Sequence, residues 1–258
     1  MSTRFKINNS SGIELLNAYE LIDGFDSLVE QIKEETYSRY PEGTAGPMGG
    51  RIMDGWQDCP AIRKIATAPR ILQWLEQVYN RKPIPFQTLN FQKGTEQATH
   101  SDTIHFNPKS PGYMCGVWVA FEDIDKENGP LHYYEGSHHS PVYQFEDFNI
   151  KVDATRVGEY ESAYSEFDSS YKRYEGVVKD KMNKSVYQYR EFLTTKGGIA
   201  VWDCNLFHGG TPVLDKSRTR WSQVTHYFFK PDTKFSQPRL SNVADNDIFW
   251  RNIQPIES

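Results

Sequence analysis

The chain has 258 residues, of which 38% are hydrophobic and 24% are charged, a balance typical of a globular protein with a substantial core. Its formal net charge is -5, and no block of about five or six basic residues occurs, which argues against a nucleic-acid partner. The N-terminus leads into polar sequence and no later stretch approaches a membrane span, so we expect a soluble, cytoplasmic protein without a membrane partner.

The cysteines and the length both favour one reduced, intracellular domain. Cys59, Cys115 and Cys204 are far apart, odd in number and without a CxxC pair, so neither a disulfide framework nor a cysteine zinc site is predicted. A chain of this length fits one large β-rich domain, and we therefore expect a single domain over residues 1–258.

Residues 1–82 are predicted to be mostly helical. A helix is expected where Phe25-Asp26 offers a hydrophobic staple and an N-cap. Two more helices are expected where Pro60 and Pro69 stand in a first turn, and apolar residues recur at helical spacing after Pro69. The stretch from Pro41 to Gly55 is Gly-rich and irregular.

From residue 83 to residue 230 the pattern predicts β-strands with flanking turns, which makes the fold class mainly β with flanking helices. Residues 113–121 alternate in the way expected of a strand that is buried on both faces. Gly197-Gly198 precedes a strand-like Ile199–Trp202 segment, and a last strand is expected from Thr219 to Phe229. The remainder, residues 231–258, is a C-terminal tail.

A Tyr-rich insertion is predicted at about residues 141–196. Part of it is periodic at helical spacing, and the members of this aromatic stripe are Tyr160, Tyr164, Phe167, Tyr171, Tyr174 and Val178. The stripe indicates a helix packed on the rim of the barrel or a lid that contacts the substrate. The cavity is expected to take residues from this insertion, from the Pro41–Gly55 stretch and from the His105–Pro111 segment.

Three residues have the chemistry of a metal site. His100 and Asp102 are two positions apart, so in an extended segment their side chains leave the same face. His208 follows a strand-like segment far along the chain and precedes Gly209-Gly210. Two histidines and one carboxylate leave open positions on non-haem Fe(II) for a bidentate co-substrate and dioxygen. Asp203 is a candidate for orienting a ligand, and His226 for a buried hydrogen-bonding role.

The final strand offers an anchor for a carboxylate. Arg220 and Ser222 place a guanidinium and a hydroxyl on one face of that strand, where they suit the far carboxylate of 2-oxoglutarate. Arg218 lies on the same face, so strand alternation alone does not choose between the two arginines.

Several motifs together resemble the phytanoyl-CoA dioxygenase (PhyH) family over roughly residues 85 to 230. They are the run from His100 to Trp118, Glu122-Asp123-Ile124, Asn128-Gly129-Pro130-Leu131, Glu135-Gly136-Ser137-His138, His208-Gly209-Gly210, and Arg220-Trp221-Ser222-Gln223-Val224-Thr225-His226-Tyr227. The chain departs from the family at Glu135, where Pro is frequent, and at Pro212-Val213, where an Asn is frequent.

The resemblance implies a double-stranded β-helix (a cupin-like jelly roll) and iron ligation by His100, Asp102 and His208. It selects Arg220 over Arg218 as the 2-oxoglutarate anchor. It also implies co-substrate contacts, which we assign to Ser222, Trp118, Thr211 and Gln97. Halogenating relatives replace the carboxylate ligand with a small residue, and Asp102 therefore argues against halogenation.

The sequence thus predicts an Fe(II)- and 2-oxoglutarate-dependent dioxygenase that hydroxylates a small or carrier-linked substrate and releases succinate and carbon dioxide. Two alternatives remain. One is a jelly-roll metalloenzyme with another divalent metal, acting as a hydrolase, isomerase or lyase, and the other is a non-enzymatic small-molecule binding module. The first alternative has no need of a dicarboxylate anchor beside the metal, and the intact set of metal ligands argues against the second.

Overall fold

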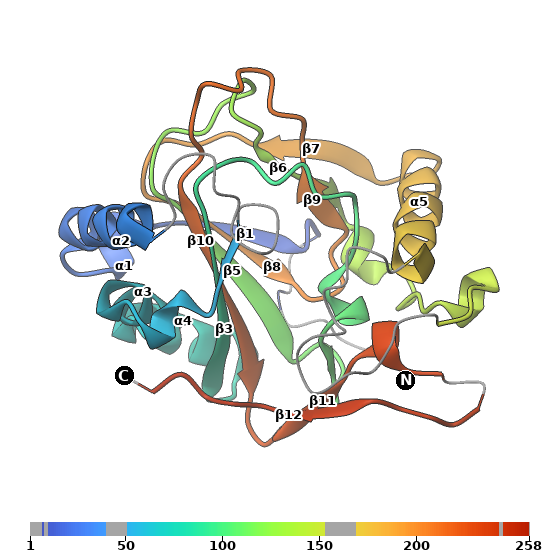
Figure 1. Cartoon of the computed structure of the whole chain (residues 1–258). Helices are drawn as coiled ribbons and strands as arrows, with labels where there is room; N and C mark the ends of the chain where they lie inside the picture. The colour runs from blue at the N-terminus through green and yellow to red at the C-terminus, as the bar shows by residue number, and fades with distance from the viewer. Residues whose placement is uncertain (1–6, 8–9, 40–50, 153–168, 243–244, 258) are drawn as a thin grey trace.

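The strand predicted at residues 113–121 is β5 (Met114–Ala120), and it lies inside a six-stranded antiparallel sheet (Figure 1). The structure is a computed structural model that describes residues 7, 10–39, 51–152, 169–242 and 245–257. The strand order is β1-β8-β5-β10-β3-β2. The other strands of this large sheet are β1 (Ile13–Asn17), β2 (Arg51–Met53), β3 (Pro83–Phe91), β8 (Gly198–Asp203) and β10 (Ser222–Phe229).

A second sheet completes the predicted jelly roll. It has the order β7-β6-β9, with bounds β6 (Leu131–Glu135), β7 (Gln188–Phe192) and β9 (His208–Gly210). Leu131 and Phe192 of this sheet pack in one buried cluster with Trp118 and Val224 of the large sheet. A third sheet has the order β12-β11-β4, with bounds β4 (Asn107–Pro108), β11 (Lys234–Ser236) and β12 (Trp250–Asn252).

Every residue of β5 is buried, as the alternating pattern predicted. Cys115, Val117 and Val119 pack on the side that the N-terminal helices cover. Trp118 and Ala120 point the other way, into the cluster between the two sheets. Because side chains alternate across a strand, apolar residues at all positions are required where both faces are covered.

The N-terminal helices cover the outer face of the large sheet (Figure 1). Their bounds are α1 (Ala18–Leu21), α2 (Phe25–Arg39), α3 (Pro60–Ala66) and α4 (Pro69–Tyr79). The starts at Pro60 and Pro69 are as predicted, whereas α2 already includes Phe25, the residue expected to precede its cap. Among the helices within the described ranges, none has the length and apolar character that crossing a membrane requires.

On the opposite side lies α5 (Ser169–Asn183), which belongs to the Tyr-rich insertion (Figure 1). Tyr174 and Val178 of the aromatic stripe are buried in a cluster with Phe145 and Phe207, which fits the prediction of a packed helix. Tyr160, Tyr164 and Phe167 lie outside the described residues. Short 3-10 helices complete the fold, namely η1 (Gly55–Gln57), η2 (Asp102–Ile104), η3 (Ser137–His139), η4 (Glu146–Phe148) and η6 (Pro238–Leu240).

Two features differ from the sequence prediction, and a third was not predicted. The N-terminal part, predicted to be mostly helical, contributes β1 and β2 to the two edges of the large sheet. The final strand begins at Ser222 instead of Thr219, because the Arg220 backbone N–H donates to the Gln92 carbonyl (2.8 Å) outside the ladder. The C-terminal tail, for which no elements were predicted, contains strand β11, which pairs with β4.

Candidate metal centre

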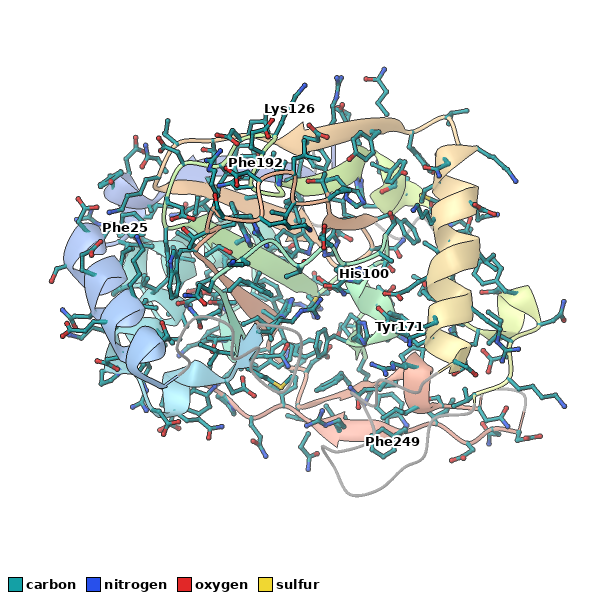
Figure 2. The ribbon with its side chains drawn as sticks, turned by 45° about the horizontal axis from the view of Figure 1, so that its top comes forward. Phe25, His100, Lys126, Tyr171, Phe192 and Phe249 are labelled. Atoms are coloured by element: carbon teal, nitrogen blue, oxygen red, sulfur yellow. The ribbon has the colours of Figure 1, made fainter. Side chains whose placement is uncertain are left out.

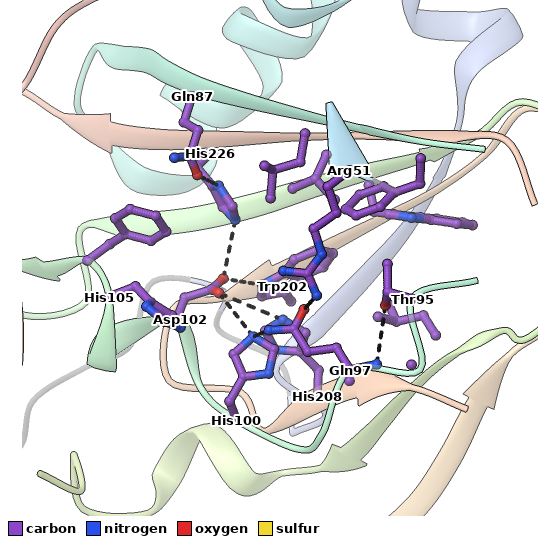
Figure 3. Close-up of a pocket in the computed structure, with 18 of the residues that line it drawn as sticks. Arg51, Gln87, Thr95, Gln97, His100, Asp102, His105, Trp202, His208 and His226 are labelled. Atoms are coloured by element: carbon purple, nitrogen blue, oxygen red, sulfur yellow. Dashed lines mark hydrogen bonds and ion pairs between the residues drawn. The ribbon is translucent and has the colours of Figure 1, made fainter. Parts of the chain in front are cut away.

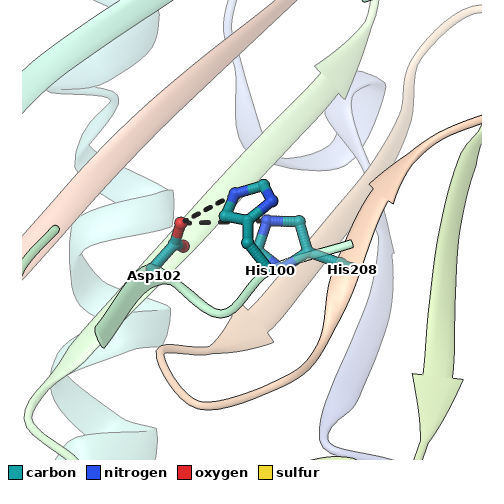
Figure 4. Close-up of side chains that lie close together, drawn as sticks. All are labelled: His100, Asp102 and His208. Carbon is teal, nitrogen blue, oxygen red and sulfur yellow. Dashed lines mark ion pairs between the residues drawn. The ribbon is translucent and has the colours of Figure 1, made fainter. Parts of the chain in front are cut away.

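Three predicted side chains converge inside the barrel (Figure 4). His100 Nε2 and His208 Nε2 each lie 3.8 Å from Asp102 Oδ1, and one potential ligand atom of each residue lies within 4.8 Å of the others. His100 and His208 also exchange backbone hydrogen bonds in both directions, each 2.9 Å long. All three residues are buried, so the segments remote in sequence present their ligand atoms to one small space.

Both imidazoles turn Nε2 toward this space, and Nε2 is the nitrogen with a lone pair available for a metal. His100 Nδ1 contacts the Ala98 carbonyl and His208 Nδ1 contacts the Leu206 carbonyl, both at 2.9 Å. Because a carbonyl can only accept, each Nδ1 carries the hydrogen and each Nε2 keeps its lone pair. Burial, reinforced by the nearby His208, holds the pKa of His100 well below its usual value. His100 is therefore neutral at physiological pH, as a metal-binding imidazole must be.

The second carboxylate oxygen of Asp102, Oδ2, contacts two further side chains of the cavity (Figure 3). The Trp202 indole N–H donates to Oδ2 at 2.7 Å, and His226 Nε2 lies 3.7 Å from the same oxygen. His226 Nδ1 contacts Gln87 Oε1 at 3.0 Å, which gives His226 the buried hydrogen-bonding role predicted from the sequence. These contacts leave Oδ1 directed toward the two imidazoles. Trp202 and His226 thus orient Asp102 in the way that residues around a metal site orient the metal's ligands.

Glycines permit this close packing at two positions. A Cβ at position 116 would lie 2.4 Å from carbon atoms of the Trp202 ring, so Gly116 leaves the room that the indole occupies. A Cβ at position 209 would lie 2.6 Å from the Gln97 carbonyl oxygen, so Gly209 lets the segment before His100 approach β9. Close packing therefore explains why a glycine directly follows His208.

Asp203, the candidate for orienting a ligand, performs a different task. Its Oδ1 accepts from the Asn205 backbone N–H (2.8 Å) and from Cys204 Sγ (3.7 Å). Its Oδ2 is buried and has no hydrogen-bond partner among the described residues. Burial raises the pKa of Asp203 from 3.8 to about 7. Trp202, its neighbour in sequence, is the residue that contacts Asp102.

We expect Asp203→Asn to stabilise the fold at pH 8 by about 2 to 4 kcal/mol, the order implied by a shift of this size. Because the folded pKa lies above the unfolded value of 3.8, the contribution of Asp203 is present below about pH 4 and is lost as pH rises through about 7. Urea unfolding of both proteins at pH 5 and pH 8 measures this. An advantage of the variant that is equal at both pH values would contradict the prediction.

Of the two arginines that the strand pattern left open, Arg220 faces the cavity. It is buried, its Nη1 donates to Ser222 Oγ (3.3 Å), and its Cζ lies 5.5 Å from the centroid of the Trp118 ring. Its Nε has no partner in the described part of the chain. Burial lowers the pKa of Arg220 to about 10, so the guanidinium stays charged. Arg218 instead forms an exposed ion pair, in which its Nη1 lies 2.8 and 2.9 Å from the two carboxylate oxygens of Asp125.

Gln97 lies directly beside the three converging residues. Its Nε2 is 3.2 Å from His100 Nε2, and its Oε1 accepts from Arg51 Nη2 at 2.7 Å (Figure 3). Arg51 was not predicted as a site residue, because it precedes the motifs and reaches them only through the pairing of β2 with β3. Thr211 is buried, but its hydroxyl donates to the Pro130 carbonyl (3.1 Å), and Thr95 lines the cavity in that region.

One cavity joins these groups. His100, Asp102, His208, Arg220, Trp118 and Gln97 all line it. Each of the three segments expected to frame the cavity contributes to its wall, through Arg51 and Met53, His105 and Phe106, and Tyr171. Arg239, from η6 of the C-terminal tail, also lines the cavity and was not predicted. Two imidazole nitrogens and one carboxylate oxygen in such a space can hold one divalent transition-metal ion.

The sequence matches the family model described as "Phytanoyl-CoA dioxygenase (PhyH)" over residues 56–220. A curated relative, phytanoyl-CoA dioxygenase domain-containing protein 1 of Danio rerio, is 28% identical over 87 residues. That match covers 32% of this chain and 30% of the relative, so less than a third of the relative's length is spanned.

Solved structures are similar over nearly the whole chain. The non-haem alpha-ketoglutarate-dependent carbocyclase SnoK from nogalamycin biosynthesis has a TM-score of 0.62 at 13% identity, with 100% of this chain and 94% of that chain covered. The epimerase SnoN, in complex with Fe3+, alpha-ketoglutarate and nogalamycin RO, has a TM-score of 0.59 at 17% identity, covering 99% and 95%. At these identities the similarity establishes the shared fold.

Proposed function

Because the chain belongs to the phytanoyl-CoA dioxygenase (PhyH) family, we propose that it is an Fe(II)- and 2-oxoglutarate-dependent oxygenase. It uses dioxygen to hydroxylate a small or carrier-linked molecule, with release of succinate and carbon dioxide. One observation supports this most strongly: His100, Asp102 and His208 converge on one wall of the cavity that Arg220 also lines. A zinc hydrolase or a nickel isomerase would need the metal ligands but no buried guanidinium beside them.

The donor set fits the proposed metal. Two neutral imidazole nitrogens and one carboxylate oxygen are the ligands of non-haem Fe(II) enzymes that leave positions open for other ligands. When bound, iron together with 2-oxoglutarate and dioxygen supplies the oxidising power to hydroxylate a C–H bond. His100, Asp102 and His208 would hold the metal, and the Trp202 indole N–H would keep the carboxylate of Asp102 turned toward it.

The buried guanidinium fits the proposed co-substrate. We assign the far carboxylate of 2-oxoglutarate to Arg220, since Arg220 Nε is buried without a partner among the described residues and needs an acceptor. Ser222 positions Arg220 through its hydroxyl, and the Trp118 ring forms the wall beside the guanidinium. Gln97 Nε2 lies 3.2 Å from His100 Nε2, so its amide would lie beside a bound metal, where we assign it a contact with the co-substrate.

Hydroxylation is proposed over halogenation because Asp102 fills the ligand position that halogenation requires to be open.

Residues 1–258 are proposed to form one oxygenase domain. The C-terminal tail supports this, because Phe235 of β11 shares a buried cluster with Phe228 of β10 and with Phe106. The N-terminal helices share another buried cluster with the large sheet.

Anaerobic titration tests this function. Adding Fe(II) and then 2-oxoglutarate to the protein without oxygen should produce a weak visible charge-transfer band, and Zn(II) with 2-oxoglutarate serves as the matched control without a band. After oxygen is admitted, succinate should form in proportion to the 2-oxoglutarate consumed. A folded protein that binds Fe(II) but gives no band and no succinate would overturn the proposal.

Replacing Trp202 with phenylalanine should weaken Fe(II) binding by about 10- to 100-fold, the cost usual for a residue that orients a metal ligand. The variant keeps an aromatic ring at the position but removes the indole N–H that contacts Asp102 Oδ2, together with part of the ring. Competition against a chelator of known affinity measures the change. Trp250→Phe is a suitable control, since Trp250 is 44% exposed and lies on the outer strand β12. Unchanged affinity in Trp202→Phe would show that the indole does not position the carboxylate.

A further inference from the structure

Gln97 stands beside the metal centre in a position that its backbone fixes. Its carbonyl accepts from the Gly210 backbone N–H at 2.9 Å, which ties it to β9. The preceding residue, Glu96, has a φ of 49°, in the left-handed region, and its Oε1 accepts from the Val213 backbone N–H at 2.9 Å. Figure 2 shows His100, three residues further on, near the centre of the molecule between the sheets and α5. The Gln97 side chain therefore leaves a well-held backbone and lines the cavity.

Two contacts select the same orientation for the Gln97 carboxamide. A guanidinium donates hydrogen bonds and accepts none, so the end of the amide that lies 2.7 Å from Arg51 Nη2 is its oxygen, Oε1 (Figure 3). The other end, Nε2, lies 3.2 Å from His100 Nε2, the imidazole nitrogen that has the lone pair. A lone pair accepts from an N–H group and not from an oxygen. Both contacts therefore turn the N–H group of the amide toward the metal centre.

This orientation matters because the two ends of an amide have opposite chemistry. An amide oxygen turned inward could itself bind a divalent ion and occupy a position that the co-substrate needs. The amide N–H group cannot bind the ion, and it donates to oxygen atoms instead. When His100 Nε2 gives its lone pair to a metal, the Gln97 N–H group needs another acceptor. The proposed function supplies one in the metal-chelating oxygens of 2-oxoglutarate.

Arg51 holds the oxygen of this amide away from the metal centre. It comes from β2, which reaches the site by pairing with β3. Its Cζ lies 5.9 Å from the centroid of the Phe91 ring, and the Arg220 Cζ lies 5.6 Å from the same centroid. Arg51 is therefore close enough to the co-substrate end of the cavity to act either through its charge or through Gln97. The direct hydrogen bond to Gln97 favours the second route.

We propose that Arg51 is a positioning residue that fixes the Gln97 carboxamide, so that its N–H group donates to the metal-chelating end of 2-oxoglutarate and its oxygen stays away from the metal. This inference rests on the proposed function and adds a residue to the same site. The family model matches residues 56–220, so Arg51 lies outside the matched segment, whereas Gln97 lies within it. The effect of Arg51 on the co-substrate passes through the Gln97 amide.

A double-mutant cycle tests this route. Binding of 2-oxoglutarate to the Fe(II) protein without oxygen is followed by the visible band in the wild-type protein, Gln97→Ala, Arg51→Met and the double variant. Gln97→Ala should raise the dissociation constant by about tenfold or more, the cost of losing a hydrogen bond to a charged group. Arg51→Met should raise it by about fivefold or more alone, and by less than about twofold when residue 97 is already alanine. An equal effect of Arg51→Met in both backgrounds, or no effect in the wild-type background, would overturn the inference.

Conservative and matched variants separate this role from a general structural one. Arg51→Lys keeps a cationic donor and should recover part of the affinity that Arg51→Met loses. Arg190→Met is the matched control, because Arg190 Nη2 also donates to a glutamine, Gln188 Oε1 at 2.6 Å, but on the exposed strand β7. It should leave the dissociation constant of 2-oxoglutarate within about twofold. Fe(II) affinity should not fall by more than about threefold in any of these variants, which also shows that they fold.

NMR of the glutamine side-chain amides gives a readout that needs neither 2-oxoglutarate nor turnover. In metal-free protein, the Gln97 resonances, assigned by their loss in Gln97→Ala, should move in Arg51→Met because the amide is no longer held. They should keep their positions in Arg190→Met. Unchanged Gln97 resonances in Arg51→Met would show that Arg51 does not fix the amide and would overturn the inference.

The two proposals fail differently. If 2-oxoglutarate gives no band with wild-type protein and Fe(II), the proposed function and the co-substrate contact of Gln97 fail together, and the amide resonances still decide whether Arg51 orients Gln97. If the band appears but the effects of Arg51→Met and Gln97→Ala add independently, the proposed function stands and the inference about Arg51 is wrong.

Discussion

Asp102→Ala should abolish Fe(II) binding at micromolar metal and reduce succinate formation to background. Asp102 is the only anionic ligand of the proposed site, and its Oδ1 lies 3.8 Å from both imidazole Nε2 atoms. Changing a residue that merely orients a ligand costs about 10- to 100-fold in metal affinity, so loss of the ligand itself should cost more. Chelator competition and the anaerobic visible band provide the two measurements.

A neighbouring buried carboxylate supplies the control. Asp203→Asn removes a carboxylate of similar burial that does not face the imidazoles, and it should retain Fe(II) affinity within about twofold. If Asp102→Ala binds Fe(II) as well as Asp203→Asn does, Asp102 is not a ligand. Circular dichroism of both variants separates loss of metal from loss of fold.

Arg220→Gln should raise the dissociation constant of 2-oxoglutarate by about 30-fold or more, while Fe(II) affinity changes little. The expected size follows from the cost of removing one member of a buried, hydrogen-bonded charge pair, about 2 to 5 kcal/mol. Arg220 is buried beside Trp118, so water cannot readily replace the lost contact. Titration of 2-oxoglutarate into the Fe(II) protein, followed by the visible band, gives the constant directly.

Arg218→Gln is the matched control for this experiment. Arg218 lies two residues away and pairs with Asp125 at the surface, so its loss should leave the dissociation constant within about twofold. Equal weakening in the two variants would mean that Arg220 is not a specific anchor. Loss of Fe(II) binding in Arg220→Gln would instead indicate that the residue supports the metal centre itself.

The sequence predicted the parts of the fold that have strong local patterns. The buried alternation of β5 and the Pro-initiated helices α3 and α4 could be read directly, because their periodicity reflects burial. The strands β1 and β2 were missed, because they are only 5 and 3 residues long and exist through pairing with β8 and β3. Such short edge strands are specified by tertiary contacts more than by their own residues.

The convergence of His100, Asp102 and His208 was predicted from spacing and family resemblance, and the structure brings these side chains together. The contact of Trp202 with Asp102 and the places of Arg51 and Arg239 in the cavity wall were not predicted. A tryptophan in an apolar strand is indistinguishable from a core residue until its N–H is placed against a carboxylate. The two arginines come from segments whose local sequence carries no motif, so only the folded chain reveals them.

The mutual backbone bonds between His100 and His208 have a consequence for how the protein matures. These hydrogen bonds hold the two histidine-containing segments together without a metal ion. The backbones of His100 and His208 therefore lose most of their conformational entropy during folding, and they lose little more when a metal ion binds. Under the proposed function, we expect the chain to fold its barrel before iron binds and to take up the metal without refolding.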